Sequence, residues 1–144
     1  MSEECWLCKN SEQLIKKFNL WKIIINENQY YLGRIVLGLN RHEEDFLNIS
    51  PNEKEKMFVL LQKIANMLKR CFNPDKLNYA VLMNQDKHVH MHIIPRYKKK
   101  RVLESFTFVD ENFGHNPFQQ NIHSFKLEKR IFNKIIEQLK NALY

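Results

Sequence analysis

The chain contains the stretch Lys87-His88-Val89-His90-Met91-His92-Ile93-Ile94-Pro95-Arg96, in which three histidines alternate with apolar residues. Successive side chains of a strand point to opposite faces, so the three histidines share one face at intervals of about 6.6 Å. The intervening residues Val89, Met91 and Ile93 then face the core. Pro95 cannot donate to a central ladder and ends the pattern. The stretch predicts a short strand with a row of titratable nitrogens on one face.

Length and composition predict one globular domain. The chain has 144 residues, 44% of them hydrophobic, with only 3 glycines and 4 prolines, and a chain of this length builds one core. We expect a single domain over 1–144, with its core in 5–97 and a C-terminal loop and helix in 98–144. No apolar run is long enough to cross a membrane, and residues 1–5 lack a signal-peptide pattern, so we expect a cytoplasmic protein without a membrane partner.

The charge of the chain predicts an anionic partner. A net charge of +7 attracts nucleotides, polyphosphates or nucleic acid. The densest basic cluster, residues 98–101, directly follows the histidine stretch and would form a basic rim for a substrate, or else a solvated turn. Binding of long nucleic acid normally uses a wide basic face with stacking aromatics. One short cluster makes a nucleic-acid module the less favoured alternative.

The three cysteines cannot all pair in a disulfide framework. In a reduced compartment Cys5-x-x-Cys8 indicates metal or redox chemistry, whereas Cys71 is typical of a small buried hydrophobe. Two cysteines supply half of a tetrahedral zinc site, so two further ligands have to come from distant parts of the chain. His42, at a strand end, and His88, the outer member of the row, are the natural candidates.

The N-terminal part of the chain predicts a short helix and a β-hairpin. Ser11 can cap a helix whose apolar stripe lies in 14–18. Gly33 and Gly38 suggest bulges or close backbone approach within the second strand of the hairpin. The first strand, the turn and the second strand are expected at 21–25, 26–28 and 30–39.

The clearest element is a helix over 50–72. Ser50 is the expected N-cap, Pro51 suits the first helical position, and Glu53 completes a capping box. A strand over 78–83 is expected to form an antiparallel hairpin with the histidine strand through 84–87, followed by an irregular loop over 102–123 and a last helix from about Ser124. This order predicts an α+β fold in which helices pack on one face of an antiparallel sheet.

The histidine row favours chemistry at phosphorus. A neutral imidazole is a good nucleophile near pH 7, and its neighbours can donate protons or hydrogen bonds to phosphate oxygens. His90, the middle member, has an imidazole on each side. Asn84 and Gln85, at the bend before the row, can approach the same face. Histidines at alternate positions can also share a catalytic zinc, so a zinc-dependent hydrolase is the alternative.

Residues 88–94 match the His-x-His-x-His-x-x signature of the histidine triad (HIT) family of nucleotide-binding hydrolases and transferases. The sequence also resembles this family in Pro95-Arg96-Tyr97, in 32–42, in the capped helix and in 78–84. The resemblance covers roughly residues 5–97. It implies that His90 attacks the α-phosphate to form a nucleotidyl-histidine intermediate.

The resemblance further implies phosphate contacts from His92 and Asn84 and places Asn26 near the family's acidic ribose ligand. Several HIT proteins with an N-terminal Cys-x-x-Cys bind zinc through two cysteines and two histidines, which here are Cys5, Cys8, His42 and His88. Many members are homodimers whose sheets join, which implies pairing through 50–72 and 78–84.

Two departures from the family pattern bear on the reaction. The loop that precedes the row in the phosphoramidase branch is longer than the corresponding residues 84–87 here. Its phosphate-binding side chains therefore have no counterparts in this chain, and the resemblance does not fix which leaving group is preferred. The third position of the row is His92, where the hexose-1-phosphate uridylyltransferase branch has glutamine, and this argues against sugar-phosphate transfer.

Overall fold

The computed structural model of the chain describes residues 5–9 and 12–143. Within these residues the main sheet has five strands in the order β1-β2-β3-β5-β4, and every neighbouring pair is antiparallel. The strands are β1 Leu14–Lys17, β2 Trp21–Ile25, β3 Ile35–Leu39, β4 Lys76–Ala80 and β5 His90–Arg96. The predicted α+β fold with an antiparallel sheet is confirmed.

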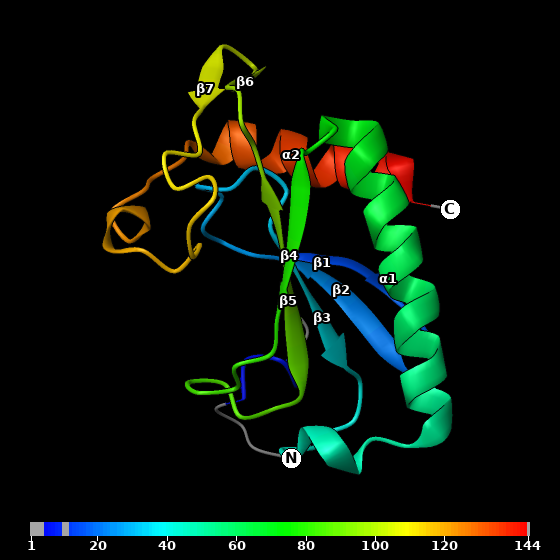
Figure 1. The fold of residues 1–144 in the computed structure, drawn as a ribbon. Helices are drawn as coiled ribbons and strands as arrows, with labels where there is room; N and C mark the ends of the chain where they lie inside the picture. The colour runs from blue at the N-terminus through cyan, green and yellow to red at the C-terminus, as the bar shows by residue number, and fades with distance from the viewer. Residues whose placement is uncertain (1–4, 10–11, 144) are drawn as a thin grey trace.

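Both helices pack on the same face of the sheet. α1 (Pro51–Phe72) and α2 (Lys129–Ala142) contribute buried side chains to one cluster with β2, β3 and β5. Figure 1 shows α1 along one side of the sheet and α2 behind its upper end, whereas the long segment between β7 and α2 lies on the other side. Burial of these apolar faces drives the packing, at roughly 25 cal/mol per Å² removed from water. Neither helix has the length and hydropathy that a span across a bilayer requires within the described residues.

The second face of the sheet is also covered. Ile24 and Val36 pack with Leu7 of the N-terminal segment, and Ile94 packs with Tyr31 and Ile122 in a separate cluster. All residues of β2 and β3 are therefore buried, and both strands have continuous apolar runs where a half-exposed strand would alternate.

The helix predicted from Ser11 is wrong in its described part, because residues 14–17 form strand β1, paired with β2; Ser11 lies outside the described residues. Ile15 joins the main core while Leu14 joins the cluster on the other face. These two residues alternate between faces, and a stretch this short fits the strand period as well as the helical one.

Several other boundaries differ from the prediction. α2 begins at Lys129 where about Ser124 was expected, and β5 includes Pro95, which was expected to end it. The second hairpin strand begins at Ile35 because Gly33 makes a turn with φ +87°, where an added Cβ would lie 3.0 Å from Leu68 and Phe72. The strand expected at 78–83 is Lys76–Ala80. The loop expected after residue 102 contains a two-stranded hairpin and a short 3₁₀ helix: β6 Arg101–Leu103, β7 Phe106–Phe108 and η2 Gln120–Ile122.

The predicted start of α1 is confirmed, with both hydrogen bonds of the Ser50–Glu53 capping box present. The Glu53 carboxylate also accepts from Nε and Nη2 of Arg41 at 2.8 and 2.9 Å. These hydrogen bonds from Arg41 lower the pKa of Glu53 to about 2. They tie the segment after β3, which contains the short η1 helix Phe46–Asn48 and carries His42, to the first turn of α1.

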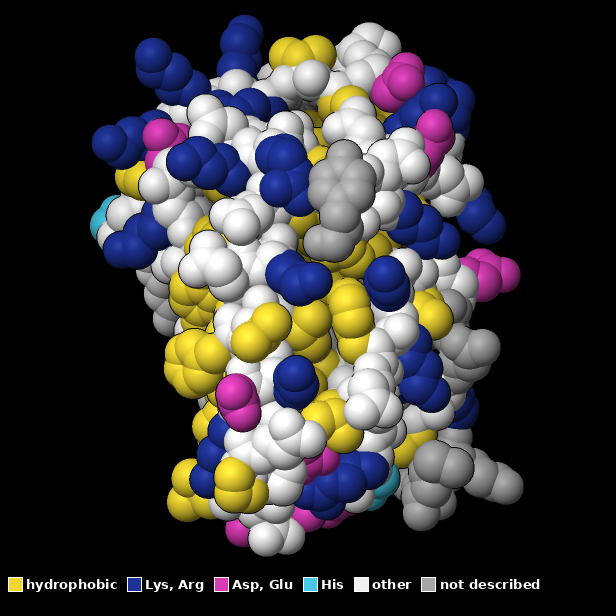
Figure 2. Space-filling view, turned by 90° about the vertical axis from the view of Figure 1, so that its right-hand side faces the viewer, with side chains coloured by type: hydrophobic (Ala, Val, Ile, Leu, Met, Phe, Trp, Pro, Cys, Tyr) yellow, Lys and Arg dark blue, Asp and Glu magenta, His cyan; other side chains and the backbone are white. Residues whose placement is uncertain are grey.

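α1 also exposes apolar side chains. Phe58 and Val59 are 70% and 47% exposed, and Tyr79 of the edge strand β4 is 50% exposed. Figure 2 shows hydrophobic side chains gathered among lysines and arginines on the face that α1 presents. Of the predicted basic cluster, Arg101 donates to the Phe72 and Asn73 carbonyls at the end of α1 and so has a structural role.

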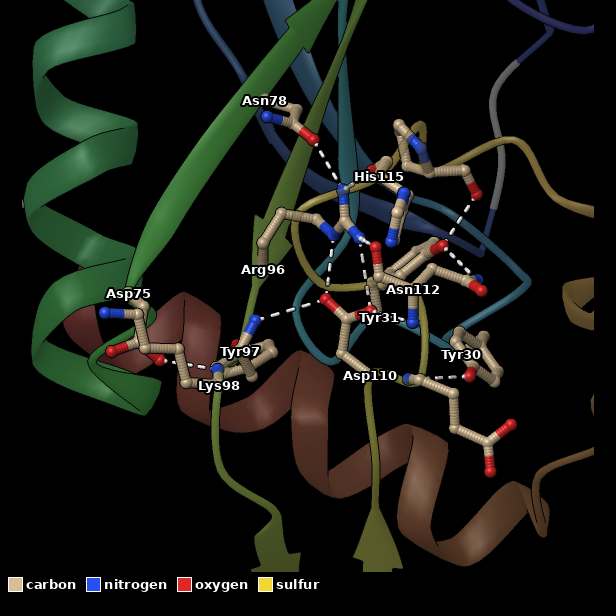
Figure 3. Close-up of polar contacts among 12 residues, drawn as sticks. Tyr30, Tyr31, Asp75, Asn78, Arg96, Tyr97, Lys98, Asp110, Asn112 and His115 are labelled. Carbon is tan, nitrogen blue, oxygen red and sulfur yellow. Dashed lines mark hydrogen bonds and ion pairs between the residues drawn. The ribbon is translucent and has the colours of Figure 1, made fainter.

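Arg96 anchors the loop after β7 to the sheet. Its guanidinium, 3% exposed, pairs with the Asp110 carboxylate at 2.8 Å and also donates to the carbonyls of Asn112 and His115 (Figure 3). Its carbon Cζ lies 4.8 Å from the centre of the Tyr31 ring. A buried charge that is paired and fully hydrogen-bonded in this way fixes the surrounding backbone.

Arg96→Met is expected to destabilise the fold by about 3 kcal/mol, because it leaves the carboxylate of Asp110 buried and unpaired. Urea unfolding measures the loss. Arg130→Met is the matched control, since Arg130 is 54% exposed and its pair with Glu104 spans 3.4 Å, so its removal costs at most about 0.5 kcal/mol. Equal losses in the two variants would contradict the anchoring role of Arg96.

Candidate metal centre and active-site cleft

Four predicted ligands from three parts of the chain form a candidate metal centre. One side-chain donor atom from each of Cys5, Cys8, His42 and His88 lies within 4.8 Å of all the others. Nδ1 of His42 lies 3.1 Å from the Cys8 sulfur and 3.2 Å from Nδ1 of His88, which lies 3.4 Å from both sulfurs. A tetrahedron with bonds of about 2.0–2.3 Å has edges of roughly 3.3–3.8 Å. Two of the four separations fall in this range and two are slightly shorter, so the donor set and its spacing are compatible with zinc.

The second nitrogen of each histidine is held away from the cluster. Nε2 of His88 lies 2.6 Å from the Leu39 carbonyl, and Nε2 of His42 lies 2.9 Å from a carboxylate oxygen of Glu44. Both oxygens accept, so both Nε2 atoms donate and both Nδ1 atoms present lone pairs to the cluster. Outer hydrogen bonds of this kind orient metal-binding imidazoles. Burial lowers the pKa of His88, which favours the neutral, ligating form.

The N-terminal segment is fixed to the sheet beside this cluster. The buried ammonium of Lys22 donates to the Leu7 carbonyl, and burial lowers the pKa of Lys22. An added Cβ at Gly38 would lie 3.2 Å from the Leu7 side chain, so the predicted close approach at this glycine is present. These contacts place both cysteines next to the start of β5.

His90 presents one defined nitrogen for chemistry. Its Nδ1 lies 2.6 Å from the His88 carbonyl oxygen. Because a carbonyl only accepts, this nitrogen carries the proton and the neutral ring keeps its lone pair on Nε2. His90 is 5% exposed and lines a cleft of about 540 Å³. It can act as a nucleophile in this tautomer.

His92 is the neighbour of His90 in the cleft. Their ring centres are 5.1 Å apart, and the centre of the Phe118 ring lies 6.0 Å from that of His92. Burial, followed by the charges of Arg34 and His90, lowers the pKa of His92 to about 4. His92 is therefore neutral at pH 7 and can donate a hydrogen bond without carrying a charge.

The predicted substrate-binding residues lie around the same cleft. Asn84 and Gln85, in the loop before β5, and Asn26, at the end of β2, line it together with His90 and His92. The Asn26 side chain accepts from the backbone of Asn28, so it also stabilises its turn. The basic residues 98–101 are not among those that line the cleft.

Sequence reasoning missed several residues of the cleft. Arg34 and Phe118 belong to this set, and Glu27 supplies a carboxylate next to Asn26. Gln13, Asn26 and Glu27 also line a second cavity of about 730 Å³ beside α2, so the two hollows adjoin. The two-residue period of an extended chain could have indicated Arg34, which precedes Val36 by two residues and so shares its face. Phe118 lies too far along the chain for any local pattern to place it.

Comparison with known proteins identifies the class of this fold and site. Residues 9–99 match the HIT domain. This match covers more than half of the chain, and the chain belongs to the HIT domain family, as the histidine signature predicted. The family binds nucleotides and includes hydrolases. No curated protein sequence matches the chain.

Solved structures show the same fold. A histidine triad protein from Bradyrhizobium japonicum superposes with a TM-score of 0.72 at 18% identity over 92% of each chain. Another from Sinorhizobium meliloti gives 0.71 at 16% identity, over 90% of this chain and 88% of that one. A HIT family protein from Bacillus anthracis gives 0.62 at 20% identity over 100% of both.

Protein purified without a histidine tag is expected to contain about one zinc per chain. Cys8→Ser should lose the metal and lower Tm by at least about 5 °C, since the metal binds only the folded cluster. Cys71→Ser, in α1 and outside the cluster, should keep the metal. Metal-free wild-type protein that melts at the same temperature with and without added zinc would contradict the site.

Proposed function

We propose that the chain is a nucleotide hydrolase or nucleotidyl transferase that works through a nucleotidyl intermediate on His90. Its substrate is a nucleoside phosphate ester, anhydride or phosphoramidate, such as a diadenosine polyphosphate. The observation that carries this proposal is the hydrogen bond from Nδ1 of His90 to the His88 carbonyl, which leaves the Nε2 lone pair at the cleft. Membership of a nucleotide-binding family supports the same substrate class.

In the proposed reaction Nε2 of His90 attacks the α-phosphorus of the nucleotide. An N–P bond forms, the bond from phosphorus to the leaving group breaks, and the leaving group departs with the bonding electron pair and takes up a proton from solvent. Water, or another acceptor, then attacks the same phosphorus and loses a proton. The N–P bond breaks, which returns neutral His90 and releases the nucleoside monophosphate or its transfer product.

The neighbouring groups would stabilise the charge that develops on the phosphate oxygens. Neutral His92 can donate one N–H, and the Asn84 and Gln85 amides lie in the loop that borders the cleft. Hydrogen bonds of this kind, fixed before the reaction, act most strongly where water is excluded. Asn26 would lie on the nucleoside side, where the adjoining cavity begins.

The alternative reaction uses the histidine row to hold a catalytic zinc. The ring orientations favour the nucleotidyl reaction, because Nδ1 of His88 faces the cysteine sulfurs whereas Nδ1 of His90 is engaged by a carbonyl. A zinc at the four-residue cluster would pin the N-terminal segment to the start of β5 and would occupy His88. The reacting phosphate would then meet His90 and His92.

His90→Ala is expected to lower hydrolysis of diadenosine tetraphosphate at least about 10³-fold, because no other group replaces the nucleophile. Binding of AMP should stay within about tenfold of wild type, since the phosphate donors remain. Intact-mass measurement after mixing should detect the nucleotidyl adduct on wild type alone. His123→Ala, in an exposed turn, is the matched control. Wild-type turnover by His90→Ala would rule out the nucleophile.

We also propose a homodimer that joins two sheets through α1 and β4. β4 lies at the edge of the main sheet, and pairing would cover its unpaired backbone groups. The exposed Phe58 and Val59 of α1 and Tyr79 of β4 supply apolar surface on the two elements proposed to pair.

Light scattering is expected to give twice the chain mass of 17.5 kDa at micromolar concentration. Phe58→Glu should shift the protein toward the monomer, because it places a charge in the buried centre of the interface. Val102→Glu, which changes an exposed residue of β6, should stay dimeric. A wild-type mass equal to that of one chain would contradict the dimer.

A further inference from the structure

Arg34 is a buried cation without an acidic partner. It lies directly before β3 and is 8% exposed. Among the described residues its guanidinium forms no ion pair, and its buried Nε has no hydrogen-bond partner. Its Cζ lies 5.7 Å from the centre of the Phe118 ring. Buried charges are normally paired, so an anionic ligand would supply the counter-charge that this guanidinium lacks.

The guanidinium belongs to the cleft that contains the reactive histidines. Val36 of β3 lies opposite His92 of β5, and Arg34 precedes Val36 by two residues, so its side chain points to the same face. Its charge is the second cause, after burial, of the lowered pKa of His92. The buried Nδ1 of His92 likewise has no partner among the described residues. Two residues of the cleft lining therefore each have a buried nitrogen without a partner among the described residues.

The position of Arg34 is fixed by its backbone. Its N–H donates to the Tyr31 carbonyl at 3.0 Å, and its carbonyl accepts from the Asn26 N–H at 3.0 Å and from the Gln29 side chain at 2.8 Å. Of the described residues that line the cleft, Arg34 is the one lysine or arginine. The backbone of this cation is thus held in place before any ligand arrives, and the same lining also contains the carboxylates of Glu27 and Asp86.

We propose that Arg34 binds the phosphoryl group that His90 attacks and so restricts the cleft to anionic 5′-phosphorylated nucleosides. Its Nε–H and one Nη–H would donate in parallel to two nonbridging oxygens, the fork geometry that guanidinium offers to phosphate. The inference rests on the proposed function for the nucleotide class, but binding by Arg34 requires no turnover. The permanent charge of Arg34 near His92 would also stabilise the charge on the transferred group.

Calorimetric titration with AMP and with adenosine tests the proposal. Arg34→Gln keeps a polar side chain but removes the charge, and it should weaken AMP binding at least about tenfold while adenosine affinity stays within about twofold. The AMP affinity of Arg34→Lys should lie between those of wild type and Arg34→Gln, because lysine keeps the positive charge but lacks the paired N–H donors of the guanidinium. Lys99→Gln removes the same charge from an exposed side chain outside the cleft and should bind AMP as wild type does.

A second measurement uses the wild-type protein alone. In a ¹H–¹⁵N spectrum the Arg34 Nε–H signal should move downfield and exchange more slowly with AMP or inorganic phosphate, but not with adenosine, because only the anions supply an acceptor. A purely structural Arg34 would respond to neither. Wild-type AMP affinity in Arg34→Gln, or a wild-type protein that binds neither AMP nor phosphate, would overturn the proposal. Turnover by His90→Ala would instead count against the nucleotidyl reaction and leave the Arg34 result standing.

Discussion

Two hydrogen bonds from imidazole nitrogens to backbone carbonyls orient His88 and His90 differently, so that each presents a different nitrogen as an acceptor. His88 donates from Nε2 to Leu39, so its Nδ1 faces the cysteines, whereas His90, which lines the cleft, donates from Nδ1 to His88 and keeps its lone pair on Nε2. A carbonyl only accepts, and each contact therefore selects one tautomer. The peptide group of the candidate metal ligand thereby orients the residue proposed as nucleophile.

The rest of the fold keeps these two carbonyls in place. The N–H of Leu39 donates to the Val89 carbonyl, and the N–H of Val89 donates to the Glu43 carbonyl, so the residue between His88 and His90 is held to the end of β3 and the segment that follows it. Helices cover one face of the sheet, and the N-terminal segment and the loop anchored by Arg96 cover the other. That second face consequently buries His90 and the cation Arg34 in the lining of one cleft.

Local patterns predicted what local forces determine. The capping box at Ser50 and the alternation of the histidine strand specify their structures within a few residues, and the donor types of Cys5 and His42 indicated their association. The strand β1 was missed because its short apolar stretch fits either period until β2 pairs with it. The β6–β7 turn, with Glu104 and Ser105 at positive φ, lacks the usual Asn-Gly signal. Phe118 reaches the cleft only through contacts distant in sequence.

The most direct test of this account is the tautomer of His90, measured by long-range ¹H–¹⁵N correlation on protein labelled with ¹⁵N in its histidines. The account predicts a proton on Nδ1 and a lone pair on Nε2 in the neutral ring. It also predicts that phosphorus–nitrogen coupling in the trapped nucleotidyl adduct involves Nε2. A neutral His90 protonated on Nε2, or an adduct on Nδ1 or on another histidine, would contradict the assignment of His88 to the metal centre and of Nε2 of His90 to the reaction.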